Sequence, residues 1–230
     1  MDTTTHAFLS RSATRRTRPA SPGRRALLAV AVIGAIGAAI AAPSVALAAP
    51  LPGQPAPDFS LRDLEGRTVR LADLRGKTVV LEWHNPGCPF VQKHYRSGNL
   101  PGLQKRYARA DTAWLVVNST HAGHPDHLDA AALGEHLKAT NAAPTAYLLD
   151  ADGRAGRAYG ARTTPQLFVI DPAGKVAYAG AIDSIRSAST EDIPKARNHV
   201  AAALDELRAG KPVSVATSTP YGCNVKYAPD

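Results

Sequence analysis

The chain has two cysteines, and Cys88 lies where a cysteine is often reactive. It follows an apolar run at residues 78–83 and an Asn-Pro-Gly turn, and Pro89 comes directly after it. Proline suits the first position of a helix because its missing N–H would be unpaired there anyway. We therefore expect Cys88 to face the free amides and the positive dipole end of a helix. That setting favours the thiolate, which is the nucleophilic form of a cysteine.

The second cysteine, Cys223, lies in a polar tail at residues 210–230. It is 13 positions from Gly210, and an extended chain of that length spans up to about 43 Å. The tail is therefore long enough to reach Cys88. Three interpretations remain open at this point: a reversible redox pair, a permanent disulfide with Cys88, and an unpaired thiol.

Three further side chains are candidates for supporting a reactive sulfur. Arg162 precedes a Thr-Thr-Pro turn, and a guanidinium beside Cys88 would stabilise the thiolate and polarise a peroxide. The alternative is an ordinary surface arginine. Glu82 and His84 flank Trp83 at the end of the apolar run, and either can carry a proton for the sulfur. Alternation along a strand places both on the face opposite Trp83.

The spacing of His121, His124 and His127 is that of metal ligands, and imidazole suits zinc or copper. However, no cysteine pair lies near them in the sequence, and Asp126 and Asp129 are equally suited to capping a helix. We expect a solvated polar loop here and no metal site.

The elements that position these residues follow from apolar runs and the breaks between them. Strand and helix segments alternate, and a β-hairpin and a last helix follow. This order predicts a mixed central sheet with helices on both faces. The predicted segments are a hairpin at residues 58–61 and 68–71, strands at 78–83, 112–118 and 145–149, helices at 88–109 (broken at 97–101) and 126–140, a second hairpin at 166–170 and 175–178, and a helix at 193–209.

Residues 1–48 have the pattern of a secretory signal. Arginines are followed by an apolar run at residues 26–42 and a small-x-small cleavage site at 46–48. The pair Arg24-Arg25 is also compatible with a twin-arginine signal. The alternative is a retained membrane anchor. We expect an exported protein, periplasmic or secreted, with no stable membrane association once the signal is cleaved.

The remaining residues 49–230 have the size of one domain. Of the 27 Lys and Arg residues and 19 Asp and Glu residues, six and one lie in residues 1–48, which leaves 21 and 18. This near-neutral balance, without a basic run interleaved with aromatics, argues against a nucleic-acid partner. There is no Gly-x-Gly-x-x-Gly and no phosphate-binding loop, so we expect no cofactor.

Over residues 52–209 the chain resembles the thioredoxin-like superfamily. Within it, the chain looks most like the redoxin branch that includes alkyl hydroperoxide reductase and thiol-specific antioxidant (AhpC/TSA) proteins. Four segments in order carry the resemblance: Pro-Asp-Phe-Ser-Leu at 57–61 with Leu-Arg-Gly-Lys at 74–77, the strand and turn ending in Cys88-Pro89, Tyr-Gly-Ala-Arg-Thr-Thr-Pro at 159–165, and Val-Ile-Asp-Pro-Ala-Gly-Lys at 169–175. The resemblance implies a thioredoxin-like α/β fold with a mixed central sheet flanked by helices and an N-terminal β-hairpin extension.

The resemblance also implies a site. Pro165 should be a cis proline that packs beside the cysteine, and Pro165 with the backbone of Thr164 should form the substrate groove. The chain departs from both active-site motifs of the superfamily. A Cys-x-x-Cys ending at Cys88 needs a cysteine at Asn85, and a peroxiredoxin motif needs threonine at Asn85 and proline at Leu81. Asn85 can place a donor or acceptor near the sulfur but cannot form a disulfide.

A narrower group of exported redoxins shares further marks with this chain. These are Asn-x-x-Cys-Pro-Phe-Val at residues 85–91, Lys-His-Tyr at 93–95, Gly-Ala-Ile-Asp at 180–183 and Gly-Cys-x-Val-Lys-Tyr at 222–227.

The function that the resemblance implies is that of an exported thiol-dependent oxidoreductase. Cys88 would attack a peroxide or a protein disulfide, Cys223 would resolve the intermediate, and an external dithiol would reduce the resulting disulfide. Two other classes stay open. One is a non-catalytic thiol or copper-binding module that uses Cys88, Cys223 and a histidine. The other is a structural domain with a permanent disulfide.

Overall fold

The computed structural model describes residues 49–229, so the predicted signal at residues 1–48 lies outside the described residues. All described residues belong to one compact unit. Within residues 49–229, no helix is long and apolar enough to cross a membrane.

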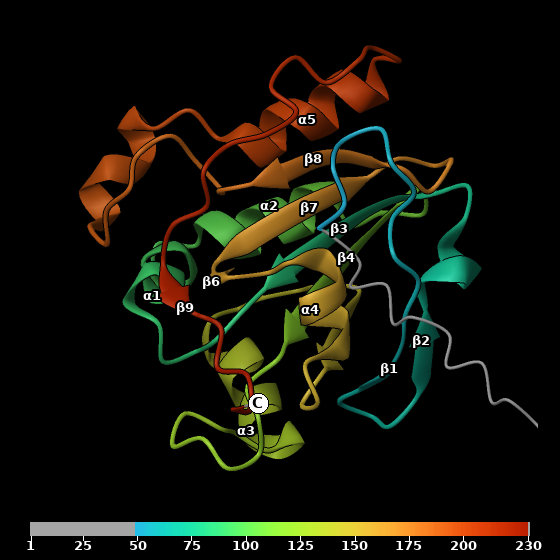
Figure 1. The fold of residues 1–230 in the computed structure, drawn as a ribbon. Helices are drawn as coiled ribbons and strands as arrows, with labels where there is room; N and C mark the ends of the chain where they lie inside the picture. Colours follow the sequence, from blue (N-terminus) through green and yellow to red (C-terminus); the bar gives the residue numbers. More distant parts are fainter. Residues whose placement is uncertain (1–48, 230) are drawn as a thin grey trace, which may run out of the picture. The chain divides into compact units, whose positions relative to one another are not determined.

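A seven-stranded mixed sheet forms the centre of this unit (Figure 1), in the order β2-β1-β5-β4-β3-β7-β8. Strand β3 pairs in parallel with β4, and β4 with β5, while β3–β7, β7–β8 and β1–β5 are antiparallel. The predicted mixed sheet and the N-terminal hairpin extension, β1–β2, are therefore confirmed. The strands are β1 (Ser60–Asp63), β2 (Thr68–Arg70), β3 (Thr78–Trp83), β4 (Thr112–Asn118), β5 (Ala146–Leu149), β7 (Gln166–Ile170) and β8 (Val176–Gly180).

Helices cover both faces of the sheet, because the apolar side chains of β3 point alternately to one face and to the other. Val80 packs with side chains of α1, α2, α3 and α5, whereas Val79 and Leu81 pack on the other face with Tyr159 of α4. Because successive side chains of a strand point to opposite faces, one apolar strand serves two cores. The helices are α1 (Pro89–Arg96), α2 (Asn99–Tyr107), α3 (Ala130–Ala139), α4 (Arg154–Tyr159) and α5 (His199–Arg208), with 3-10 turns η1 (Leu71–Leu74) and η2 (Thr190–Lys195).

Two predicted helix starts were wrong. Helix α3 begins at Ala130 because Asp129 is its N-cap, with the Asp129 side chain accepting a hydrogen bond from Ala132 N at 2.8 Å. Helix α5 begins at His199 because Asn198 caps it in the same way. The residues before α5 form η2, which contains Pro194. In both places a capping side chain sets the boundary, and the apolar pattern does not.

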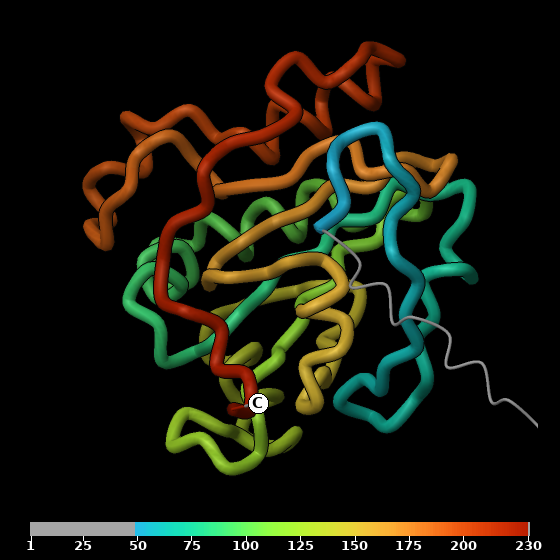
Figure 2. Tube along the Cα trace, viewed as in Figure 1, coloured from blue at the N-terminus to red at the C-terminus, as the bar shows by residue number. Residues whose placement is uncertain are grey.

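The tail runs back across the domain (Figure 2), from the end of α5 past β8 toward α3. Ala179 N donates to Ala216 O at 3.0 Å, which attaches the start of the tail to β8. Further along, β9 (Cys223–Asn224) pairs antiparallel with β6 (Thr163–Thr164). Neither of these two-residue strands was predicted, since a strand this short has no periodicity to detect.

Candidate active site

Cys88 is the N-cap residue of α1, with Pro89 at the first helical turn, as the sequence predicts. Gln92 N donates to Cys88 O at 2.9 Å, which closes the first turn of the helix. The residue is 2% exposed. Its Sγ donates a hydrogen bond to Thr164 O at 3.0 Å, so the sulfur is held against the loop that precedes β7.

That loop contains the expected cis proline. The peptide bond between Thr164 and Pro165 is cis, and both residues are buried. The cis peptide that the resemblance implies is therefore present, and the residue before Pro165 contacts the cysteine. The carbonyl of Thr164 carries the contact, and the pyrrolidine ring has no polar group to offer.

Cys223 lies at the same point, brought there by the pairing of β9 with β6. In this pairing Cys223 is the direct partner of Thr164, the residue whose carbonyl contacts Cys88. Both cysteines are free thiols, and Cys223 is half-buried. The site thus combines two thiols that are 135 positions apart in the sequence.

The neighbours of Cys223 keep it protonated. Burial, and then the hydrogen bond with and charge of Cys88, raise the pKa of Cys223 to about 12. Lys226 opposes this shift in the pKa, and Asp126 adds to it. Two of the three main causes depend on Cys88 being a free thiol or thiolate. We therefore expect the pKa of Cys223 to fall once Cys88 enters a disulfide.

Asn85 shapes the turn before Cys88. Its Oδ1 accepts from Gly87 N at 2.7 Å, its backbone oxygen accepts from Cys88 N at 3.1 Å, and its Nδ2 donates to Asp126 Oδ2 at 3.3 Å. These bonds fix the loop between β3 and α1, at the end of which Cys88 lies. Among the described residues, the Asn85 side chain makes no hydrogen bond to either sulfur.

Arg162 takes part through its backbone. Its O accepts from Val225 N at 3.0 Å, which extends the pairing of the tail with β6. Its side chain is exposed, and among the residues that the structure describes it makes no hydrogen bond or ion pair. The exposed side chain therefore favours the alternative interpretation of Arg162 as an ordinary surface arginine.

Glu82 and His84 lie on the face of β3 opposite Trp83, as predicted. Their hydrogen bonds go to other buried side chains and not to the sulfur of Cys88. Glu82 is fully buried and accepts hydrogen bonds from Tyr95 OH at 2.7 Å, Trp114 Nε1 at 2.7 Å and Gln104 Nε2 at 3.2 Å. Burial raises the pKa of Glu82, and these three bonds oppose the rise. Its carboxylate ties α1, α2 and β4 together.

His84 is held in a similar way. Its Nδ1 lies 2.9 Å from the hydroxyl of Tyr147. Burial, and then the charge of His136, keep the pKa of His84 well below its ordinary value. His84 is therefore neutral at neutral pH and packs in the interior.

The histidine loop borders the tail, since His121 N donates to Lys226 O at 2.9 Å, but among the described residues none of its three imidazoles hydrogen-bonds to either sulfur. The rings of His121 and His124 are 5.6 Å apart, and His124 Nδ1 accepts from Asp126 N at 3.0 Å. His127 lines a separate cavity of about 200 Å³ beside α3. Within residues 49–229, no group of three or more His, Cys, Asp or Glu side chains is arranged to hold a metal ion.

One buried polar cluster had no role assigned from the sequence. It consists of Lys93, His94, Asp183 and Tyr221, which come from three separate segments. The sequence did carry a signal for it, since these residues lie in or beside three of the marks shared with exported redoxins. That signal could not show that the three marks meet.

Comparison with known proteins agrees with this fold. Residues 52–179 match the AhpC/TSA family. The thiol-disulfide oxidoreductase ResA of Geobacillus thermodenitrificans is 31% identical over 124 residues, which are 54% of this chain and 66% of the relative. The ResA of Bacillus subtilis is 27% identical over 54% of this chain and 64% of the relative. The chain thus spans just under two thirds of the length of these curated relatives.

Two crystal structures are similar over most of the chain. A hypothetical protein of Sinorhizobium meliloti has a TM-score of 0.68 and 26% identity, covering 80% of this chain and 98% of that protein. A conserved protein of Geobacillus kaustophilus has a TM-score of 0.65 and 26% identity, covering 79% and 94%. The thioredoxin-like fold is confirmed.

Proposed function

Because the chain belongs to the AhpC/TSA family, we propose that it is a thiol-dependent oxidoreductase in which Cys88 and Cys223 form a reversible disulfide. One observation carries the proposal. Two free thiols, 135 positions apart, meet at the N-terminus of α1 against the same Thr164 residue. Burying two thiols side by side at a helix start has no evident packing purpose, whereas it suits thiol exchange.

With a disulfide substrate, the reaction has two exchange steps. The Cys88 thiolate attacks one substrate sulfur, and the other leaves as a thiolate that takes up a proton. Cys223 then loses its proton and attacks Cys88 Sγ, which releases the second substrate thiol. The substrate disulfide gains two electrons, and the protein dithiol becomes the Cys88–Cys223 disulfide. An external dithiol returns the two electrons. The ResA relatives are named as thiol-disulfide oxidoreductases, which supports this substrate class.

Hydrogen peroxide is a second candidate oxidant, and the burial of the site favours it. Cys88 is 2% exposed, and β9 covers the backbone of Thr164 on which an extended polypeptide would pair. In this case Cys88 attacks one peroxide oxygen, water leaves and a sulfenic acid forms. Cys223 then displaces a second water to give the same disulfide. The proposal includes export of the protein to the periplasm or the exterior, where a disulfide persists.

The test is intact-mass analysis of the reduced protein after one equivalent of glutathione disulfide or of hydrogen peroxide. We expect the wild type to lose two hydrogens. Cys223→Ser should stop at a glutathione adduct or at one added oxygen. Cys88→Ser should react slower by about tenfold or more, since burial still raises the pKa of Cys223 after the charge of Cys88 is removed. If both single variants react like the wild type, or if the wild type never loses two hydrogens, the proposal is wrong.

The charges around Cys223 predict the pH dependence of the closing step. Cys223 attacks as a thiolate, so the closing rate should rise with pH up to the pKa of that thiol. Asp126→Asn removes a charge that raises this pKa, and Lys226→Met removes one that lowers it. We expect closing to become about twofold to fivefold faster in the first variant and slower in the second.

Stopped-flow measurement of closing from the glutathione adduct, between about pH 6 and 9, checks this result. Because both charges are partly exposed, added salt should shrink both effects. Shifts of the same sign in the two variants would contradict the electrostatic explanation.

A further inference from the structure

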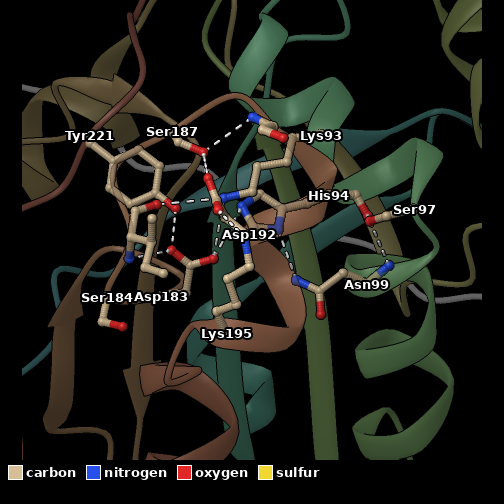
Figure 3. A network of polar contacts seen from close by, with 12 residues as sticks. Lys93, His94, Ser97, Asn99, Asp183, Ser184, Ser187, Asp192, Lys195 and Tyr221 are labelled. Carbon is tan, nitrogen blue, oxygen red and sulfur yellow. Dashed lines mark hydrogen bonds and ion pairs between the residues drawn. The ribbon is translucent and has the colours of Figure 1, made fainter.

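A buried polar cluster joins the two segments that carry the thiols. It consists of Lys93 and His94 on α1, Asp183 after β8, and Tyr221 in the tail (Figure 3). Lys93 is five positions after Cys88, and Tyr221 is two positions before Cys223. Lys93 and Tyr221 are thus close to the two cysteines in the sequence. The cluster itself takes no part in the thiol exchange described above.

Asp183 is the centre of the cluster. Its Oδ1 accepts hydrogen bonds from Tyr221 OH and from Ile185 N, the latter at 3.1 Å. Its Oδ2 lies 3.6 Å from Lys93 Nζ and 3.8 Å from His94 Nε2. One carboxylate therefore faces α1 with one oxygen and the tail with the other, as Figure 3 shows.

The burial of these groups is nearly complete. The side chains of Lys93 and Asp183 are 0% and 3% exposed. Above all, burial lowers the pKa of His94 to about 4, so His94 is neutral and Lys93 and Asp183 form the ion pair. Burial, and then the hydrogen bond to Asp183, raise the pKa of Tyr221, so its hydroxyl keeps the proton that it donates.

A buried ion pair adds little net stability, because the desolvation of both groups offsets their attraction. Its geometry is nevertheless demanding, since moving either partner leaves an unpaired buried charge. A cluster of this kind selects one arrangement of the segments that it joins. Here those segments are α1, which starts directly after Cys88, and the tail just before Cys223.

From this arrangement we infer that Lys93, Asp183 and Tyr221 are positioning residues that hold Cys223 against Cys88. The inference rests on the proposed function and adds to it the means by which the thiols are kept together. Tyr221 is the last anchor before Cys223, with Gly222 alone between them. Its ring also packs against Phe90 of α1, with centroids 5.8 Å apart. The hydroxyl of Tyr221 therefore sets the effective concentration of Cys223 at Cys88.

Tyr221→Phe tests the inference, because it keeps the ring and removes the hydroxyl that donates to Asp183. The equilibrium constant for closing the Cys88–Cys223 disulfide, measured in glutathione buffers, should fall about tenfold. The rate at which Cys88 forms a glutathione adduct, measured in a Cys223→Ser background, should stay within about twofold. Asp183→Asn is the second variant and should also weaken closing while sparing the first step.

The matched control is Tyr107→Phe. Tyr107 is also buried and donates its hydroxyl to an aspartate, Asp205, at 2.8 Å, but it lies at the end of α2. This control should change neither the closing equilibrium nor the first step. A purely structural role for Tyr221 predicts a lower free energy of unfolding in Tyr221→Phe with no change in the closing equilibrium.

The outcomes separate the two proposals. If the wild type forms no Cys88–Cys223 disulfide in any glutathione buffer, the proposed function fails. If the wild type closes and folded Tyr221→Phe and Asp183→Asn close equally well, the positioning role alone is overturned.

Discussion

Replacing Gly222 with alanine is expected to weaken the closing of the Cys88–Cys223 disulfide strongly while leaving Cys88 reactive. Gly222 has a φ of +141°, a conformation that residues with a side chain rarely adopt. A Cβ at this position would overlap the carbonyl oxygen of Thr164 and lie 2.7 Å from its carbon. Both atoms are backbone, so relief requires β9 to move away from β6. The closing equilibrium should fall by about 100-fold, the equivalent of about 3 kcal/mol.

The measurement is the closing equilibrium in glutathione buffers, together with alkylation of Cys88 as a report on the first thiol. Gly210→Ala is the matched control. Gly210 also has a positive φ, of +67°, and lies at the start of the tail, but a Cβ added there would have nothing within 4 Å. Gly210→Ala should therefore introduce backbone strain without a steric clash. Its closing equilibrium should be close to that of the wild type. A Gly222→Ala protein that closes as well as this control would show that β9 is not what holds Cys223 in place.

Replacing Glu82 with leucine is expected to cause the largest loss of stability. The substitution leaves three buried donors, Tyr95 OH, Trp114 Nε1 and Gln104 Nε2, without their acceptor. An orphaned buried donor costs about 1–3 kcal/mol. Relief from burying a carboxylate, whose pKa is raised by that burial, offsets part of this cost. We expect the free energy of unfolding to fall by about 3 kcal/mol.

Urea denaturation of the reduced protein checks this value. Glu82→Gln keeps one acceptor oxygen and should lose less stability than Glu82→Leu. Glu135→Leu is the control for the same chemical change at an exposed position, where the carboxylate pairs with Lys138 at 2.8 Å. It should change stability by less than about 0.5 kcal/mol. If Glu82→Leu is as stable as Glu135→Leu, the buried network is not what holds α1 and α2 to the sheet.

The two expected results concern the two segments that present the two cysteines. Glu82 holds the helix that presents Cys88, through Tyr95 of α1. Gly222 allows the tail to approach Thr164 closely enough to present Cys223. A loss at Glu82 should lower stability whether or not the tail is bound. A loss at Gly222 should weaken the attachment of the tail and so change the redox equilibrium, while α1 and Cys88 stay in place.

The sequence by itself determined the local features of this protein. The Cys88-Pro89 pair predicts a helix start, and the apolar run at residues 78–83 predicts a buried strand. Both are confirmed, because capping and strand burial depend on neighbouring residues. Family resemblance added the fold and the cis peptide before Pro165. Helix starts that depend on one capping side chain, such as Asp129, were missed by a few residues.

The tertiary structure alone decided how these features combine. It brings Cys223 to Cys88 through β6 and β9, which are too short to have a sequence pattern. It also buries Lys93, a residue type that is normally solvated, because Asp183 meets it from a segment 90 positions away. The physical reason is the same in both cases. The path of the tail is set by contacts between residues far apart in the chain, and only the folded chain determines which of them meet.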